Sequence, residues 1–163
     1  MAAKTRFLNP DSMSKPAGFS QVVEVRTPGR MVFVSGQLGV GADGKVVGSP
    51  GDFRAQAVQA FENLEAALAA IGAGFEHLIK LNNYLVDLAH LPVLREVRNS
   101  YLDPAALPAS TTMQVVAFAR PGALFEVDAI AVLPANARAK SATKSAAARR
   151  AKRHAGGRRR PGK

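Results

Sequence analysis

Apolar residues recur every three or four positions along residues 53–72, which is the spacing of one buried face of an α-helix. Asp52 stands just before this stretch, where its carboxylate can accept a hydrogen bond from a free N–H group of the first turn. Gly72 or Gly74 is expected to end the helix. We therefore predict a helix over residues 53–72. Its buried face consists of Phe53, Ala57, Ala60, Phe61, Leu64, Ala67, Leu68 and Ile71.

A second helix is predicted over residues 91–102, with Pro92 in its first turn, where the missing N–H costs nothing. Its apolar face consists of Leu94, Val97 and Tyr101. Between the two helices, residues 80–86 are predicted to form a strand, because strand side chains alternate between two faces. One face carries Leu81, Asn83 and Leu85, and the other carries Asn82, Tyr84 and Val86.

Two apolar stretches follow, residues 111–119 and 124–133. They are predicted to pair as a hairpin joined at Arg120-Pro121-Gly122, because a Pro-Gly pair suits a tight turn. Both stretches are apolar on both faces, and such strands must be covered on both sides.

Two carboxylates interrupt the last apolar stretch. Glu126 and Asp128 are expected to share a face with Ile130, because side chains two residues apart point the same way. Carboxylates directed at a covered surface are paired, hydrogen-bonded or functional.

The N-terminal part is predicted to contain a hairpin of strands over residues 19–26 and 31–38, after a loose lead-in over residues 1–15. Gly36 lies within the second of these strands. It indicates either a bulge or a close approach of the backbone to another chain or a ligand. Residues 39–51 are rich in Gly, Asp and Pro and are expected to form a loop.

The predicted order is ββαβ followed by αββ, which describes a single α+β domain. Two helices can cover one face of its sheet. The other face needs a cover that the chain does not encode, and association with further copies is the economical solution.

Composition excludes several kinds of chemistry. The chain has no cysteine, so disulfides, thiol catalysis and thiolate metal sites are excluded. Its three histidines, His77, His90 and His154, lack the spacing of metal ligands, and we expect no metal and no cofactor. No secretory pattern and no apolar run long enough to cross a bilayer is found, so a cytoplasmic protein without a membrane partner is expected.

Charge divides the 163 residues into two parts. Eleven of the 22 Lys and Arg residues lie in residues 137–163, which contain no Asp or Glu and no large apolar side chain. We therefore predict a folded domain over residues 1–136 and a basic, disordered tail over residues 137–163. The tail suits non-specific contact with nucleic-acid phosphates, and the alternative is a solubilising extension. Its main cationic positions are Arg149, Arg150, Lys152, Arg153, Arg158, Arg159 and Arg160.

Several short motifs, in order along residues 16–133, resemble the RidA/YjgF family, also called Rid or L-PSP endoribonuclease-like proteins. They are Pro16-Ala-Gly-Phe-Ser-Gln21, Phe33-Val-Ser-Gly-Gln-Leu38, a helix containing Gln56 and Glu62-Asn63-Leu64, Leu85-Val-Asp-Leu88, Pro108-Ala109, and the Phe125–Val132 strand ending in Ala129-Ile-Ala-Val132. The resemblance implies a chorismate-mutase-like sandwich. It also implies a homotrimer whose sheets line a central barrel, with a small-molecule cleft at each subunit interface.

The family's best-known activity is hydrolysis of reactive enamines and imines to keto acids and ammonia. Asp128 matches the acidic position associated with the attacking water, and Gly36 also matches. Family members carry an arginine after the Pro-Ala pair that clamps the substrate carboxylate, whereas this chain has Ser110 there. Phe19 stands where deaminating members often carry Tyr. Ser110 and the adjacent Thr111 are expected to line the cleft.

Two functions stay open from the sequence. The first is an imine or enamine deaminase of the arginine-lacking subgroup, with weak or altered activity and with Asp128 positioning water. The second is a trimeric protein that binds a small molecule or nucleic acid without catalysis.

Overall fold

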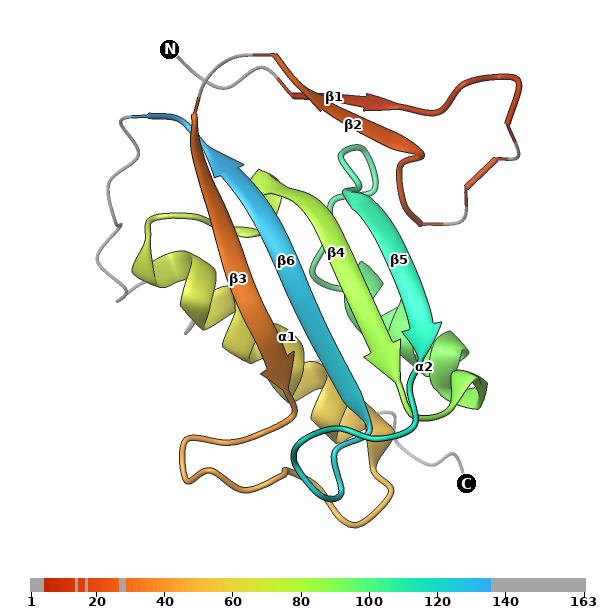
Figure 1. Ribbon diagram of the computed structural model, residues 1–163, viewed down its shortest axis with the longest axis vertical. Coiled ribbons are helices and arrows are strands. Elements are labelled where there is room, and N and C mark those ends of the chain that lie inside the picture. The colour runs from red at the N-terminus through yellow and green to blue at the C-terminus, as the bar shows by residue number, and fades with distance from the viewer. Residues whose placement is uncertain (1–4, 14, 17, 27–28, 136–163) are drawn as a thin grey trace, which may run out of the picture.

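The computed structural model describes residues 5–13, 15–16, 18–26 and 29–135. Its centre is a four-stranded sheet in the order β3 (Arg30–Leu38), β6 (Phe125–Leu133), β4 (Leu78–Leu85), β5 (Ala109–Gln114). The helices α1 (Phe53–Ala70) and α2 (Leu91–Asn99) lie together on one face of this sheet (Figure 1). Short 3-10 turns, η1 (Phe75–His77) and η2 (Leu88–His90), flank β4. The chain thus has the mixed α+β architecture that the sequence predicted.

The first helix forms as predicted, because its signals are local. Asp52 caps it by accepting a hydrogen bond from the Ala55 N–H at 3.0 Å. The helix ends at Ala70, and Gly72 follows with a φ of +79°, a conformation that favours glycine. Six of the predicted stripe residues are fully buried, namely Phe53, Ala57, Ala60, Phe61, Leu64 and Leu68.

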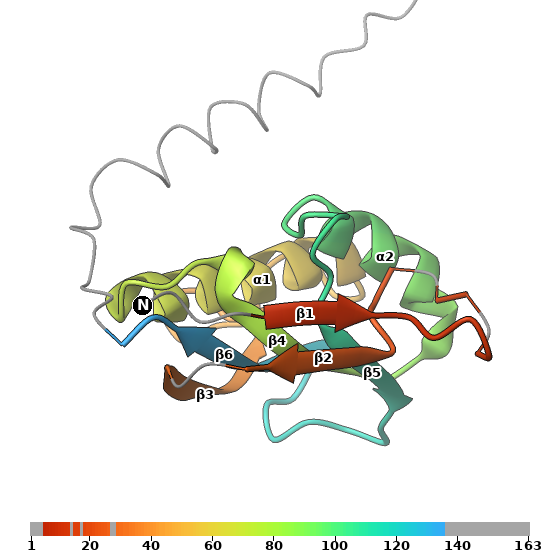
Figure 2. The ribbon, with the colours of Figure 1, turned by 90° about the horizontal axis from the view of Figure 1, so that it is seen from above.

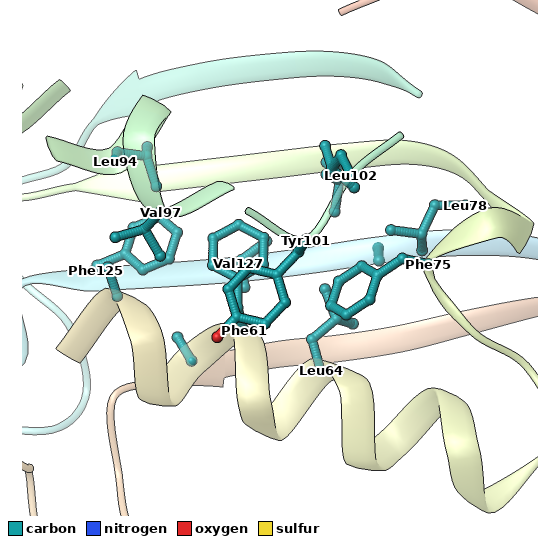
Figure 3. Close-up of a cluster of buried hydrophobic side chains, with 14 of the residues drawn as sticks. Phe61, Leu64, Phe75, Leu78, Leu94, Val97, Tyr101, Leu102, Phe125 and Val127 are labelled. Atoms are coloured by element: carbon teal, nitrogen blue, oxygen red, sulfur yellow. The ribbon is translucent and has the colours of Figure 1, made fainter. Parts of the chain in front are cut away.

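Aromatic rings fill the space between the helices and the sheet (Figure 3). The Phe61 ring stacks on Tyr101 at a centroid distance of 5.1 Å and on Phe125 at 5.9 Å. Phe75 packs against Tyr101 at 5.2 Å. Tyr101 lies just beyond the end of α2, so the predicted second helix is three residues too long although its apolar face is correct.

The predicted hairpin of residues 111–119 and 124–133 is wrong. β5 ends at Gln114 and pairs in parallel with β4, whereas β6 lies between β3 and β4. Burial explains the difference, because β6 is apolar enough for a central position while β5 carries exposed side chains at the sheet's edge. Val116, predicted to lie in a strand, is fully exposed in the connection.

The N-terminal prediction also needs correction. The strand predicted over residues 19–26 forms only over β2 (Val22–Val25), which pairs with β1 (Thr5–Leu8) in a separate two-stranded sheet (Figure 2). β1 falls in the stretch predicted to be a loose lead-in. β3 pairs with β6 instead of with β2, because its apolar face then joins the main core, where Val32 and Val34 pack.

The second face of the four-stranded sheet is not covered by any described segment (Figure 2). On this face the side chains of Phe33 and Met31 are 72% and 59% exposed. This agrees with the expectation that two helices leave one side of the sheet bare.

Candidate functional site

A hydrogen-bonded polar cluster lies on the uncovered face, where β4 and β6 pair. Asn82 stands directly opposite Asp128 in the strand register. The Asn82 Nδ2 group donates to Asp128 Oδ1 at 2.8 Å, and the Tyr84 hydroxyl donates to Asp128 Oδ2 at 2.9 Å. Both oxygens of this half-buried carboxylate are therefore held in fixed positions.

Glu126 lies beside this cluster on the same face, opposite Tyr84 in the register. It is half-buried. Its burial, and next the negative charge of Asp128, raise the pKa of the Glu126 carboxyl. The hydrogen bond to Asp128 raises the pKa of the Tyr84 hydroxyl, with burial as a further cause. The two carboxylates have different surroundings, since Asp128 is anchored by two hydrogen bonds and the pKa of Glu126 is raised.

Gly36 provides the space that Glu126 occupies. The pairing of β3 with β6 shifts by one residue between Val34 and Gln37, so a bulge lies at Gly36. A Cβ atom at this position would collide with Glu126 Oε1. The predicted bulge is confirmed, and the close approach is made by Glu126 of the same chain.

Lys80 and Thr111 extend the polar cluster along the uncovered face. The Lys80 ammonium group donates to Thr111 Oγ1 at 2.6 Å, and Thr111 pairs with Asn82 in the register. The cluster therefore carries a cation and a hydroxyl beside two carboxylates.

Ser110 faces the opposite side of the sheet. Asn83, which is completely buried on the helix side, donates through Nδ2 to Ser110 Oγ at 3.1 Å. The Asn83 Oδ1 atom is buried without a hydrogen-bond partner. Ser110 and Asp128 are therefore not brought together within one chain.

Phe19 directly precedes Ser20, which is bonded to the start of β5. The Ser20 N–H donates to the Pro108 carbonyl at 3.1 Å, and the Ser20 hydroxyl donates to the Leu107 carbonyl at 2.6 Å. Ser20 bridges to Ala109 where β5 begins, and Ser110, the next residue of β5, bonds to Asn83. We call these residues, with Gly18 and Phe19 that directly precede Ser20, the edge cluster: Gly18, Phe19, Ser20, Asn83 and Ser110.

Comparison with known proteins decides the family. The family model described as Endoribonuclease L-PSP matches residues 11–133. The chain belongs to the Rid (endoribonuclease L-PSP) family. It is 40% identical over 127 residues to Protein DfrA of Myxococcus xanthus, which covers 77% of this chain and 93% of that protein. It is 28% identical over 130 residues to a 2-iminobutanoate/2-iminopropanoate deaminase of Dermatophagoides farinae, covering 78% and 96%.

Solved Rid structures share the fold. A Rid-family protein from Yersinia pestis superposes with a TM-score of 0.70 at 33% identity, covering 79% of this chain and 98% of that one. RidA from an Antarctic Psychrobacter bacterium gives a TM-score of 0.59 at 32% identity, covering 72% and 93%. The predicted family is thereby confirmed.

Two residues of the polar cluster, Asn82 and Tyr84, were not predicted from the sequence to take part in a site. The alternation over residues 80–86 predicts that Asn82 and Tyr84 share a strand face, without assigning a role to either side chain. Their hydrogen bonds to Asp128 depend on the pairing of β4 with β6. Asn82 and Tyr84 lie 46 and 44 residues before Asp128 in the sequence, so this pairing is not visible locally. The sequence signal that could have identified them is their alternation with buried residues along β4, which places both polar side chains on the same face of the sheet.

Among the described residues, no group of three or more His, Asp or Glu side chains could hold a metal ion. His77 accepts a hydrogen bond from the Gly74 N–H at 3.1 Å, and the His90 ring stacks on Phe53 at 4.4 Å. No described helix is long and apolar enough to span a membrane. His154 and the seven cationic tail positions lie outside the described residues.

Proposed function

We propose that this Rid-family protein hydrolyses small imines or enamines on the uncovered face of its sheet, with further copies of the chain closing over that face. The observation that carries the proposal is the pair of half-buried carboxylates, Glu126 and Asp128, held in different hydrogen-bonding environments on one bare surface. Two carboxyl groups that lie in different environments can take distinct roles in a reaction.

In this proposal Asp128 orients the reacting water. Each of its oxygens accepts one hydrogen bond from the protein and keeps a second lone pair for a water O–H. Asn82 and Tyr84 both donate to Asp128 and hold its two oxygens in place as acceptors.

Glu126 transfers the proton. The substrate reacts as the imine protonated on nitrogen. The water oxygen bonds to the imine carbon while Glu126 takes one of the water protons, which gives a neutral carbinolamine. Glu126 then returns this proton to the amine nitrogen, the C–N bond breaks with its electron pair going to nitrogen, and Glu126 accepts the hydroxyl proton as the carbonyl compound and ammonia leave; this last proton passes to solvent. An enamine enters the same sequence after protonation at carbon. The raised pKa of Glu126 suits a group that both accepts and donates a proton.

Homotrimer formation is part of the proposal. Phe33 and Met31 stand exposed on the face that carries the carboxylates, so a subunit packed there would bury apolar surface and exclude water from the site. Family membership supports this arrangement. Altered substrate preference is proposed as well, because the uncharged Ser110, which bonds to Asn83, stands where the family resemblance implies an arginine.

The test is ammonia release from 2-aminoacrylate by the wild type and by Glu126→Gln and Asp128→Asn variants. We expect weak wild-type turnover and a loss of about 100-fold or more in each variant, the usual range for removing a general acid–base group. Glu62→Gln is the matched control, because Glu62 is an exposed glutamate on α1. Unchanged rates in both site variants, or no wild-type turnover, would remove this proposal.

We also propose nucleic-acid binding by residues 137–163. The supporting observation is the set of eleven cations without a single acidic residue in this segment. Such a segment binds phosphates non-specifically, and three copies in a trimer would strengthen the contact through avidity.

A further inference from the structure

Arg98 is a buried cation without an anionic partner among the described residues. It lies in the last turn of α2 and is 6% exposed. Its Nε and Nη2 groups both donate to Asn99 Oδ1, at 3.3 and 3.1 Å, and no ion pair of the described residues includes it. A neutral amide oxygen compensates only part of the cost of removing a guanidinium from water.

The electrostatic surroundings of Arg98 make an anion more favourable there. Burial lowers the pKa of the Arg98 guanidinium, and the positive charge of Arg95 lowers it further. The nearby carboxylate on α2, Glu96, is paired with Arg54 on α1. Two positive charges therefore lie near each other without a neutralising carboxylate.

Arg98 touches the edge cluster through Gly18. A Cβ atom at position 18 would collide with Arg98 Nη2, and Gly18 has a φ of +86°. Two residues further on, Ser20 bridges to Ala109 at the start of β5. Residues 18–20 thus contact the guanidinium at one end and the strand that carries Ser110 at the other.

We infer that Arg98 is the cationic anchor for a carboxylate-bearing ligand of the edge cluster, supplying the charge that Ser110 lacks. A guanidinium offers a planar fork of donors that matches a carboxylate, and Arg98 has an N–H group at Nη1 that bonds to no described residue. The ligand class is a small 2-imino or 2-oxo acid, and this assignment rests on the proposed function.

The arrangement of copies follows from the two faces of the sheet. Asp128 and Ser110 point to opposite sides, so one small ligand cannot contact both within a chain. In a ring of copies, each contact joins two different surfaces. The edge cluster and Arg98 of one copy then meet the carboxylates of the next, and the site is complete only between them.

The experiment titrates 2-oxobutanoate, a stable keto acid, into the full-length protein and measures binding by calorimetry. We expect Arg98→Gln to weaken binding about ten- to hundredfold, the usual effect of losing a charge-assisted hydrogen bond. Arg120→Gln is the control and should bind as the wild type does, because Arg120 is an exposed arginine of the connection between β5 and β6.

Two further variants separate binding from folding. Arg98→Lys keeps the charge but loses the fork, so it should bind several-fold more weakly than the wild type at an unchanged Tm. The double variant Arg98→Gln, Ser110→Arg should regain most of the lost affinity, because it returns a guanidinium to the same cluster.

Wild-type affinity in Arg98→Gln and Arg98→Lys, or a wild type that does not bind 2-oxobutanoate, would overturn the role of Arg98. Binding of the keto acid requires no chemistry, so this result is independent of the Glu126→Gln hydrolysis assay. The two experiments can therefore give opposite answers: Arg98 can bind the keto acid without hydrolysis by Glu126, and hydrolysis can occur without binding by Arg98.

Discussion

Glu126 depends on a glycine on the neighbouring strand. The bulge in β3 places Gly36 directly under its carboxylate, and this leaves room for a half-buried acid on a surface that further copies are proposed to cover. Asp128 depends instead on donors from β4. Two carboxylates in one sequence motif thus receive different environments from different strands.

We predict that Gly36→Ala displaces Glu126 and lowers both stability and turnover. The added Cβ would overlap the carboxylate, which is the end of a flexible side chain and can turn away, so the cost in stability should lie at the low end of the about 1–3 kcal/mol typical of overpacking. Chemical denaturation and the ammonia assay measure the two effects. In a Glu126→Ala background the same substitution should cost little, because the collision is gone. An equal cost in both backgrounds would contradict the contact.

At the residue scale, the sequence predicted the face on which a side chain lies better than it predicted the residues that the side chain contacts. Alternation correctly put Glu126, Asp128 and Ile130 on one face. It did not show that Ser110 and Asp128 face opposite sides, because that depends on how β5 and β6 each pair with β4. The local periodicity of a sequence does not determine which strands pair when they lie far apart in the chain.

At the scale of elements, the helices were predictable and the strand pairings were not. The cap, apolar stripe and stop of α1 all lie within its own residues or within two residues of its ends. The Pro121-Gly122 pair indicated a hairpin, but burial decided the pairing and moved β6 to the centre of the sheet. The two-part division at residue 136 stays a prediction, since the segment beyond it lies outside the described residues.

The basic segment gives a prediction of its own. The full-length protein should bind a short DNA duplex in low salt, and the affinity should fall steeply as salt rises, because binding releases counterions. Fluorescence anisotropy measures this. A chain ending at Asn136 should bind at least tenfold more weakly. The matched control keeps the length but replaces seven cations by Gln, at Arg149, Arg150, Lys152, Arg153, Arg158, Arg159 and Arg160. Undiminished binding by either variant would leave the segment without this role.

At the scale of the whole molecule, helices cover one face of the four-stranded sheet, and no described segment covers the other face. The helix side holds a continuous aromatic and aliphatic core. The other side exposes Phe33 and Met31 next to the carboxylates and Lys80. A surface that combines bare apolar side chains with an organised polar cluster is suited to an interface that also encloses a site.

Sedimentation equilibrium of the purified protein tests this account most directly. We expect the wild type to sediment with about three chain masses at micromolar concentration. Phe33→Glu should sediment as a single folded chain, because a charge would replace an apolar side chain that is 72% exposed before association. A wild type that sediments as one stable chain would contradict both the closed site and the proposed chemistry.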